Sequence, residues 1–313
     1  MRFPAGQPPL PAREWLARVI EGQHYRNPMD DTAALDARFS RGEVVDCFAQ
    51  PIPPCRLMHP GEDLWFYRIP AEETPVPFDI RILHEDERLL VIDKPPFLAT
   101  MPRGRHITET ALVRLRRSTG NDDLIPAHRL DRLTSGVLVF IRRPQDRGAY
   151  QTLFASGGVH KQYEAVAPWR GALAEATSEE PILWSDRMEK TRGRMDARIV
   201  DGTPNARTLL RGVERLNPDE EAMLRHTYDT KEELARYVLE PLTGKTHQLR
   251  LHMCAAGVPI LGDPVYPLVR PPEEHSSWEQ PMQLLCSRMS FPDPINGDER
   301  VFRSSYFVPL AAE

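Results

Sequence analysis

The chain has 313 residues, with 40 lysines and arginines against 45 aspartates and glutamates, a formal net charge of −5 and a pI of about 6.1. This length favours two domains and allows a core that needs no disulfide or metal for stability. The beginning, MRFPAGQPPLPAREW, lacks an apolar stretch and no long apolar run follows, so we expect no signal peptide and no membrane span. The four cysteines form no CxxC pair, which argues against a zinc site and favours a reducing cytoplasm.

Positive charge is concentrated in one part of this acidic chain. Met101–Arg147 contains ten arginines and five acidic residues. Such a segment is compatible with a basic surface that meets a phosphate backbone, and equally with an ordinary solvated face. Charge by itself leaves both interpretations open.

The N-terminal part predicts a small module. Ala33–Phe39 has helical spacing, and Leu64–Ile69 is typical of a strand that follows a turn. The polar, proline-containing stretch Ala71–Val76 predicts a linker. We therefore expect a small α/β module over residues 1–75 and a larger domain over residues 76–313.

The larger domain predicts a mixed sheet. Short apolar or alternating runs predict strands at Ile80–Leu83, Arg88–Asp93, Gly136–Ile141, Gln162–Ala167 and Tyr237–Leu242. Helical spacing occurs at Thr108–Arg117, at Ala149–Phe154 and in the charged stretch 217–236, which we interpret as an insertion. Strands joined by short turns, with few long helices between them, favour an α+β fold.

The stretch Thr246–Gly257 predicts the clearest helix, with its threonine as the N-cap and its glycine as the residue that ends it. A stripe that faces the core consists of Leu249, Met253 and Ala256. Arg250 and His247 fall on an adjoining face, so we expect Arg250 to point where His247 points.

The segment HRLDRLTSG, which begins at His128, places Asp131 before a buried strand and among arginines. Nearby positive charge favours the ionised carboxylate, which can act as a nucleophile or a base. The alternative is a loop aspartate paired with arginine for structure, and the charge pattern by itself favours this alternative.

Two further segments are candidates for binding. Tyr163 is either a packing residue on a strand or a stacking surface for a base, and the helix start after Gly244 can hold an anion. His247 and His252 are five residues apart, which does not suit two metal ligands on one helix face, so we expect no metal.

Four segments occur in the order typical of RluA-type pseudouridine synthases: HRLDRLTSG, KQYEAV, LTGKTHQLRLH and GVPILGDPVY. The chain resembles this family from about Phe78 to Pro294. The resemblance implies a mixed, mostly antiparallel central sheet with flanking helices. The N-terminal segments Phe39–Val44 and Pro60–Asp63 resemble an S4-like RNA-binding module.

The resemblance also assigns roles to individual residues. Asp131 matches the essential aspartate of the family, and Tyr163 matches the tyrosine that packs on the target base. Arg250 matches the basic residue that pairs with the aspartate, and Leu249 matches an apolar neighbour of the site. Arg129 matches an arginine that helps to fill the gap left by the flipped nucleotide. The chain departs from the family at Leu285-Cys286, where His-Ala is usual.

By this resemblance we expect the chain to isomerise uridines to pseudouridine in structured RNA, without a cofactor. Large-subunit ribosomal RNA is the first expected substrate and transfer RNA the second, and the expected state is a monomer. Two alternatives come from different classes. One is a catalytically silent RNA-binding protein that keeps the fold, and the other is an unrelated hydrolase that uses Asp131 with His128 or His247.

Overall fold

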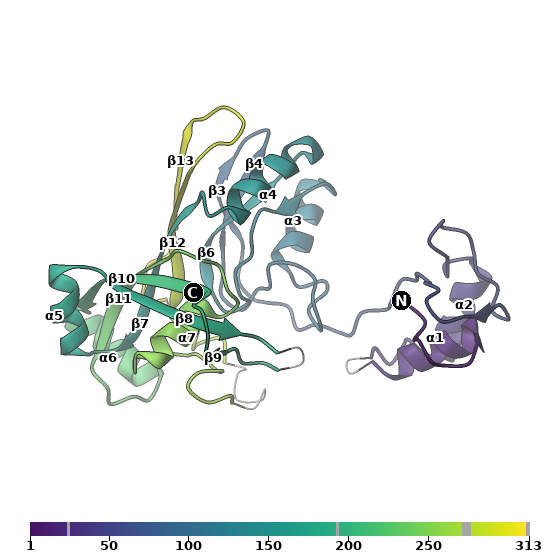
Figure 1. Cartoon of the computed structure of the whole chain (residues 1–313), viewed down its shortest axis with the longest axis horizontal. Coiled ribbons are helices and arrows are strands. Elements are labelled where there is room, and N and C mark those ends of the chain that lie inside the picture. Colours follow the sequence, from purple (N-terminus) through teal and green to yellow (C-terminus); the bar gives the residue numbers. More distant parts are fainter. Residues whose placement is uncertain (24–25, 192–193, 271–276, 311–313) are drawn as a thin grey trace. The chain divides into compact units, whose positions relative to one another are not determined.

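A computed structural model describes residues 1–23, 26–191, 194–270 and 277–310 (Figure 1). The chain divides into two compact units, one made of Met1–Thr74 with Arg103–Thr108 and the other of Pro75–Pro102 with Glu109–Glu313. Within the described ranges, no helix combines the length and the apolar character that crossing a membrane requires.

The first unit is a small α/β module. Its elements are β1 (Leu10–Pro11), α1 (Ala12–Glu21), α2 (Thr32–Ser40) and β2 (Leu57–Met58), and the two strands pair antiparallel. Helix α1 buries Trp15 and Leu16 in the module's own apolar cluster. Helix α2 lies where the spacing predicts it and is capped by the Asp31 carboxylate, which accepts from the backbone N–H of Ala34 at 2.9 Å.

The strand expected over Leu64–Ile69 is wrong. In the described structure this stretch forms one isolated bridge, from Trp65 to Val45, and a second bridge joins the preceding Asp63 to Arg2. Alternating apolar residues were present, but a strand also needs a partner along its length. The S4-like identity of the unit stays a prediction.

The second unit is built on one sheet of eleven strands, ordered β3-β4-β6-β12-β7-β11-β10-β8-β9, with β5 beside β6 and β13 beside β12. Among the described strands, β6 and β12 pair in parallel and the other neighbours pair antiparallel. The mixed, mostly antiparallel sheet is therefore confirmed. The strands are β3 (Arg81–Glu85), β4 (Leu89–Lys94), β5 (Ile125–Pro126), β6 (Ser135–Ile141), β7 (His160–Pro168), β8 (Ile182–Glu189), β9 (Arg198–Val200), β10 (Ala206–Arg215), β11 (Leu234–Pro241), β12 (Leu284–Pro292) and β13 (Glu299–Arg303).

Helices flank this sheet. They are α3 (Ala111–Thr119), α4 (Arg147–Ala155), α5 (Gly171–Glu179), α6 (Pro218–Thr227) and α7 (Gln248–Ala255), with the 3₁₀ turn η1 (Pro144–Asp146) before α4. Figure 1 shows α3 and α4 beside the half of the sheet that contains β3, β4 and β6, and α5, α6 and α7 beside the half that contains β10 and β11.

Two of the helix predictions need correction. The helical stretch expected over 217–236 is right only as far as Thr227, because the chain enters β11 at Leu234. Helix α7 begins after His247, whose φ is +60°, and Thr246 is not its N-cap. The end of that helix is as expected, since Gly257 follows it with a φ of +74°.

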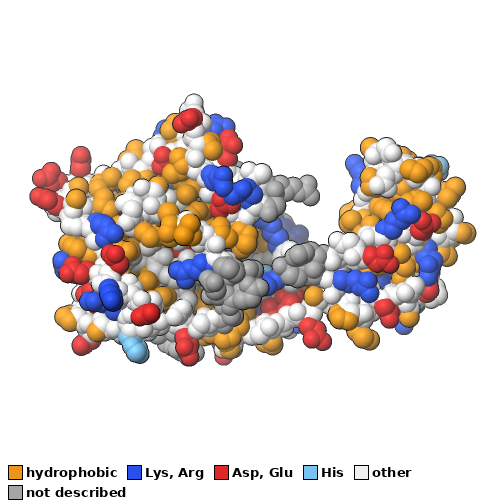
Figure 2. Space-filling view, turned by 90° about the horizontal axis from the view of Figure 1, so that it is seen from below, with side chains coloured by type: hydrophobic (Ala, Val, Ile, Leu, Met, Phe, Trp, Pro, Cys, Tyr) orange, Lys and Arg blue, Asp and Glu red, His pale blue; other side chains and the backbone are white. Residues whose placement is uncertain are grey.

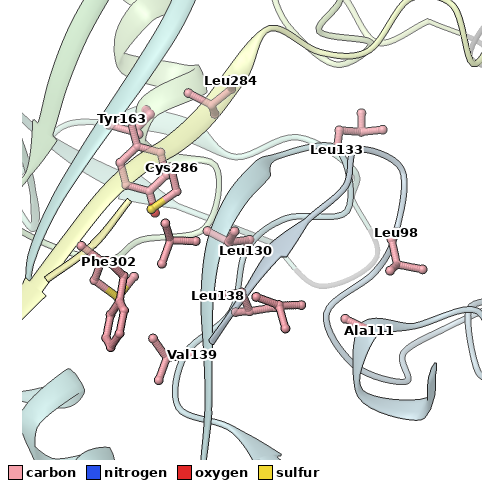
Figure 3. Packing of buried hydrophobic residues seen from close by; sticks show 14 of the residues in the cluster. Leu98, Ala111, Leu130, Leu133, Leu138, Val139, Tyr163, Leu284, Cys286 and Phe302 are labelled. Carbon is pink, nitrogen blue, oxygen red and sulfur yellow. The ribbon is translucent and has the colours of Figure 1, made fainter. Parts of the chain in front are cut away.

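The apolar core lies between the central strands and the helices, and Figure 3 shows part of it around β6, β7 and β12. Strands β4 and β6 are buried along their whole lengths, as their continuous apolar runs predict. The glycine of the TSG segment, Gly136, has a φ of +105°, and a Cβ there would lie 2.3 Å from the carbonyl oxygen of Cys286. Only glycine lets β6 and β12 approach this closely.

Candidate active site

A cavity of about 820 Å³ opens in the second unit. Three parts of the chain form most of it: the loop before β6, the end of α4 with the start of β7, and the segment from the end of β11 into α7. All five residues expected at the site line this one cavity, namely Arg129, Asp131, Tyr163, Leu249 and Arg250. Segments that lie far apart in the sequence are thus brought together as the family resemblance implies.

The loop that carries Asp131 is held by its backbone. The carbonyl oxygen of Asp131 accepts from the backbone N–H of Thr134 at 3.1 Å, which closes a turn just before β6. The Thr100 hydroxyl donates to the carbonyl oxygen of Leu130 at 2.8 Å. The Asp131 side chain is 22% exposed, so its carboxylate is largely enclosed but accessible from the cavity.

A buried lysine at the end of β4 also supports this loop. The ammonium of Lys94 donates to the carbonyl oxygens of Pro95 and Leu98, both at 2.8 Å, and of Arg132 at 3.2 Å. Burial lowers the pKa of Lys94 well below its ordinary value. The three carbonyl acceptors satisfy its donors, so the lysine fixes the position of the loop next to Asp131.

Arg250 lies beside Asp131, as expected, but its strongest partner is a residue that we did not select from the sequence. Its Nη1 is 3.5 Å from Oδ2 of Asp131, whereas its Nε and Nη2 each lie 2.7 Å from an oxygen of Asp263. Asp263 is 2% exposed and also accepts from the backbone N–H groups of Val265 and Tyr266. Because two parallel hydrogen bonds orient the guanidinium, its third nitrogen is directed at Asp131.

The signal for Asp263 was present in the GVPILGDPVY segment, which contributed only to the family resemblance. An aspartate between a glycine and a proline, as here, is typical of a turn. Its partner, Arg250, is on a different element, and only the folded chain brings the two together.

The two histidines of the hydrolase alternative are poorly suited to base catalysis. Nε2 of His247 lies 3.9 Å from Oδ2 of Asp131, but burial and the charge of Arg250 lower the pKa of His247 to about 4. The ring of His128 stacks on Phe154 with centroids 4.9 Å apart, and its Nε2 accepts from the backbone N–H of Val139 at 3.3 Å. Burial also lowers the pKa of His128 well below its usual range, and a histidine with so low a pKa is a weak base.

Tyr163 and Leu249 form apolar walls of the cavity. Tyr163 is 8% exposed and lies on β7 directly opposite Cys286 of β12. Figure 3 shows the sulfur beside the tyrosine ring, with Leu130 nearby. Burial raises the pKa of Tyr163 well above its ordinary value, so its neutral ring offers a flat surface inside the cavity.

Arg129 is exposed and lines the cavity one residue from the buried Leu130. Several other arginines of Met101–Arg147 pair with carboxylates, namely Arg114 with Glu109, Arg142 with Glu85, Arg143 with Asp146 and Arg147 with Asp123. On the face shown in Figure 2, Lys and Arg side chains alternate with Asp and Glu. Much of the arginine-rich segment therefore stabilises local structure, and a phosphate-binding interpretation applies only to the remainder.

The four cysteines are free, and the described residues contain no group of three or more His, Cys, Asp or Glu side chains placed to hold a metal.

Known proteins share both sequence and fold with the chain. Residues 88–255 match the family described as RNA pseudouridylate synthase. Pseudouridylate synthase RPUSD2 of Homo sapiens is 30% identical over 218 residues, which make up 69% of this chain and 36% of the human protein. The Dual-specificity RNA pseudouridine synthase RluA of Vibrio parahaemolyticus is 30% identical over 236 residues, covering 74% of this chain and 86% of that protein. The solved structure of Human RNA Pseudouridylate Synthase Domain Containing 1 superposes with a TM-score of 0.53 at 21% identity, covering 77% and 90% of the two chains.

Proposed function

We infer that this chain, because it belongs to the RluA-type family of RNA pseudouridine synthases, isomerises uridines to pseudouridine in structured RNA with Asp131 as the catalytic carboxylate. The observation that carries this proposal is the cavity itself, since Asp131, Arg250 and Tyr163 converge there from three separate elements.

The reaction rearranges one nucleoside. The bond between N1 of uracil and C1′ of the ribose breaks, the base turns, and C5 then bonds to C1′. The hydrogen on C5 leaves as a proton, and N1 takes up a proton. The product is an isomer of the substrate, so the balance requires no cofactor, metal or energy source. Asp131 can attack C1′, attack C6 of the base, or deprotonate the ribose in an elimination route, and each route begins from the ionised carboxylate.

The surroundings of Asp131 suit this role. The guanidinium of Arg250 places a positive charge 3.5 Å from the carboxylate, and Asp263 prevents that guanidinium from turning away. A charge pair in a largely enclosed site is stronger than the same pair in water. Arg250 therefore positions Asp131 and stabilises its negative charge.

The cavity also suits a flipped nucleotide. Its volume of about 820 Å³ lies within the range of roughly 300–1,000 Å³ that is usual for small-ligand sites. The Tyr163 ring provides a stacking surface, and Leu249 closes an apolar side. Extruding a stacked base costs a few kcal/mol, and Arg129 at the loop would offset part of that cost by filling the vacated position.

Within RNA, we propose large-subunit ribosomal RNA as the first substrate and transfer RNA as the second. The S4-like resemblance of residues 1–75 supports this order, since such a module would contribute contacts to a large structured RNA. We further propose that the protein acts as a monomer in the cytoplasm, where its four free cysteines stay reduced.

The proposal is tested by tritium release from RNA labelled at C5 of uridine, because the isomerisation must replace the hydrogen at C5. Purified wild-type protein and Asp131→Ala are each incubated with bulk ribosomal RNA and bulk transfer RNA. We expect release by the wild type only, with ribosomal RNA as the better substrate.

Two outcomes would contradict the proposal. Folded wild-type protein that binds these RNAs without releasing tritium would favour the silent RNA-binding alternative. Release by Asp131→Ala at the wild-type rate would leave the reaction in place but reject Asp131 as the catalytic group.

A further inference from the structure

The backbone at His247, just before α7, has an uncommon conformation. Its φ is +60° and its ψ is +19°, in the left-handed region that residues other than glycine seldom occupy. Such a conformation persists only where the surrounding contacts maintain it, and residues of this kind are concentrated at functional sites. The side chain of His247 is 13% exposed and lines the cavity. These observations direct attention to what the ring contacts.

The ring of His247 lies between a tyrosine and the candidate catalytic carboxylate. Its Nδ1 is 3.2 Å from the hydroxyl oxygen of Tyr266, and its Nε2 is 3.9 Å from Oδ2 of Asp131. The guanidinium of Arg250 comes nearest to the same carboxylate oxygen, at 3.5 Å. His247 and Arg250 therefore approach Asp131 at one oxygen atom.

Tyr266 is itself fixed by the segment that precedes β9. It is 6% exposed, and its hydroxyl oxygen accepts from the backbone N–H of Ala197 at 2.7 Å. The Cζ of Arg250 lies 5.4 Å from the centre of the Tyr266 ring, and the ring of His247 meets that ring edge-on, with centroids 5.8 Å apart. One buried tyrosine thus contacts both groups that approach Oδ2 of Asp131.

The hydrogen bonds of Tyr266 bear on which nitrogen of His247 carries the proton. The Tyr266 hydroxyl has one hydrogen, which it can donate to the Ala197 carbonyl oxygen at 3.2 Å or to Nδ1 of His247. The pKa of His247 is lowered to about 4, so the ring is neutral near pH 7 and has a single N–H. A proton on Nδ1 would leave the lone pair of Nε2 directed at the carboxylate, which is unfavourable. Donation from Tyr266 to Nδ1 instead places the N–H on Nε2, facing Asp131.

We propose that His247, with its proton on Nε2, donates to Oδ2 of Asp131 and is a second positioning residue for this carboxylate, beside Arg250. This inference rests on the proposed function. The distance of 3.9 Å is longer than a hydrogen bond. Hydrogen bonds of catalytic groups are often long in sites without a ligand and shorten when the substrate binds.

The variants for the test separate the donor from the backbone conformation. His247→Asn keeps a residue that tolerates the left-handed conformation, but its amide reaches only as far as Nδ1 of the histidine. His247→Gln places an amide nitrogen about as far along the side chain as Nε2. Tyr266→Phe keeps the ring beside Arg250 and removes only the hydroxyl. The matched control is His226→Asn, because His226 is exposed on α6.

Each variant is assayed by single-turnover tritium release from C5-labelled RNA over a range of excess protein, which gives a saturated rate constant and a half-saturating concentration. We expect His247→Asn to lose about 10- to 100-fold in the rate constant, the effect of one hydrogen bond to a charged group, with the half-saturating concentration unchanged. His247→Gln should retain more of the rate, and His226→Asn all of it. Tyr266→Phe should lose less than His247→Asn and add no further loss in the double variant, because both changes act through the same N–H.

Four results would overturn the proposal. Equal losses in His247→Asn and His247→Gln would mean that reach to Asp131 does not matter. A raised half-saturating concentration with an unchanged rate constant would assign His247 to direct contact with RNA. Additive losses in the double variant would separate Tyr266 from His247. A lower melting temperature of His247→Asn than of His226→Asn, with an unchanged rate constant, would leave the ring a purely structural role. No release by the wild type would instead refute the proposed function itself.

Discussion

Removing the Asp263 carboxylate tests how much the buried ion pair between Asp263 and Arg250 contributes to stability and to activity. In Asp263→Ala, the guanidinium of Arg250 loses both 2.7 Å hydrogen bonds, and it is only 4% exposed. The backbone N–H groups of Val265 and Tyr266 lose their acceptor as well. The perturbation therefore leaves a charge and two polar donors without their partner in a site that water scarcely reaches.

The expected magnitude follows from that burial. Breaking a buried ion pair by removing one partner destabilises a protein by about 3–5 kcal/mol. At about 2–4 °C per kcal/mol, the melting temperature of the second unit should fall by at least about 6 °C. Turnover should fall further than stability accounts for, because the guanidinium is no longer directed at Asp131.

The assay is thermal unfolding followed by circular dichroism, with tritium release measured well below the melting temperature. Glu233→Ala is the matched control, because Glu233 pairs with Arg215 at 3.0 Å on the same unit with both side chains more than half exposed. Such an exposed pair contributes about 0–1 kcal/mol. Asp263→Asn, which keeps the size and one acceptor oxygen, should lie between Asp263→Ala and the wild type.

If Asp263→Ala melts no lower than Glu233→Ala, the buried ion pair between Arg250 and Asp263 does not stabilise the fold as stated. If Asp263→Ala turns over uridine at the wild-type rate, Arg250 needs no second carboxylate to support Asp131.

Three further predictions concern the strands, acid stability and the cavity loop. Gly136→Ala should unfold or precipitate, because its Cβ would lie 2.3 Å from the Cys286 carbonyl oxygen. The control is Gly148→Ala in α4, where a Cβ meets nothing within 4 Å. This variant should raise the melting temperature slightly. The folded state lowers the pKa of His247 from 6.5 to about 4, so the unfolded chain takes up the proton first and stability falls as the pH drops through that interval. His247→Gln should make this loss shallower in denaturant titrations, and an unchanged slope would argue against the buried neutral ring. Arg129→Ala should leave the melting temperature unchanged. It should lower kcat/KM more on a paired target uridine than on the same uridine in an unstructured oligonucleotide. Equal losses on both substrates would reject the role of Arg129 in the position that the flipped base leaves.

Much of the second unit could be predicted from the sequence because its signals are local. Strand β4 contains the continuous apolar run LLVI and β6 the run VLVFI, and both strands are buried on both faces. Arg250 was placed beside His247 from helical spacing, and both side chains approach Asp131. The spacing did not separate the two sides of α7, however, because His247 precedes the helix and Leu249, which was expected on the core stripe, also lines the cavity.

The features that the sequence could not show are contacts between segments that lie far apart in the chain. Strand β12 joins the two halves of the sheet. Its partners on β6 and β7 lie more than a hundred positions away in the sequence, so no local pattern shows the register. The ion pair between Arg250 and Asp263 has the same origin, since it joins two separate segments of the chain. The arginine-rich stretch predicted more unpaired positive charge than the structure has. Carboxylates pair with several of its arginines.

The central claim, that the Asp131 carboxylate carries out the isomerisation, is tested most directly by single-turnover tritium release with the isosteric variant Asp131→Asn. The amide keeps the shape of the side chain but can neither attack nor take up a proton as the carboxylate does. We expect a folded variant that binds the substrate RNA as the wild type does and releases no tritium. Release at the wild-type rate by folded Asp131→Asn would contradict it.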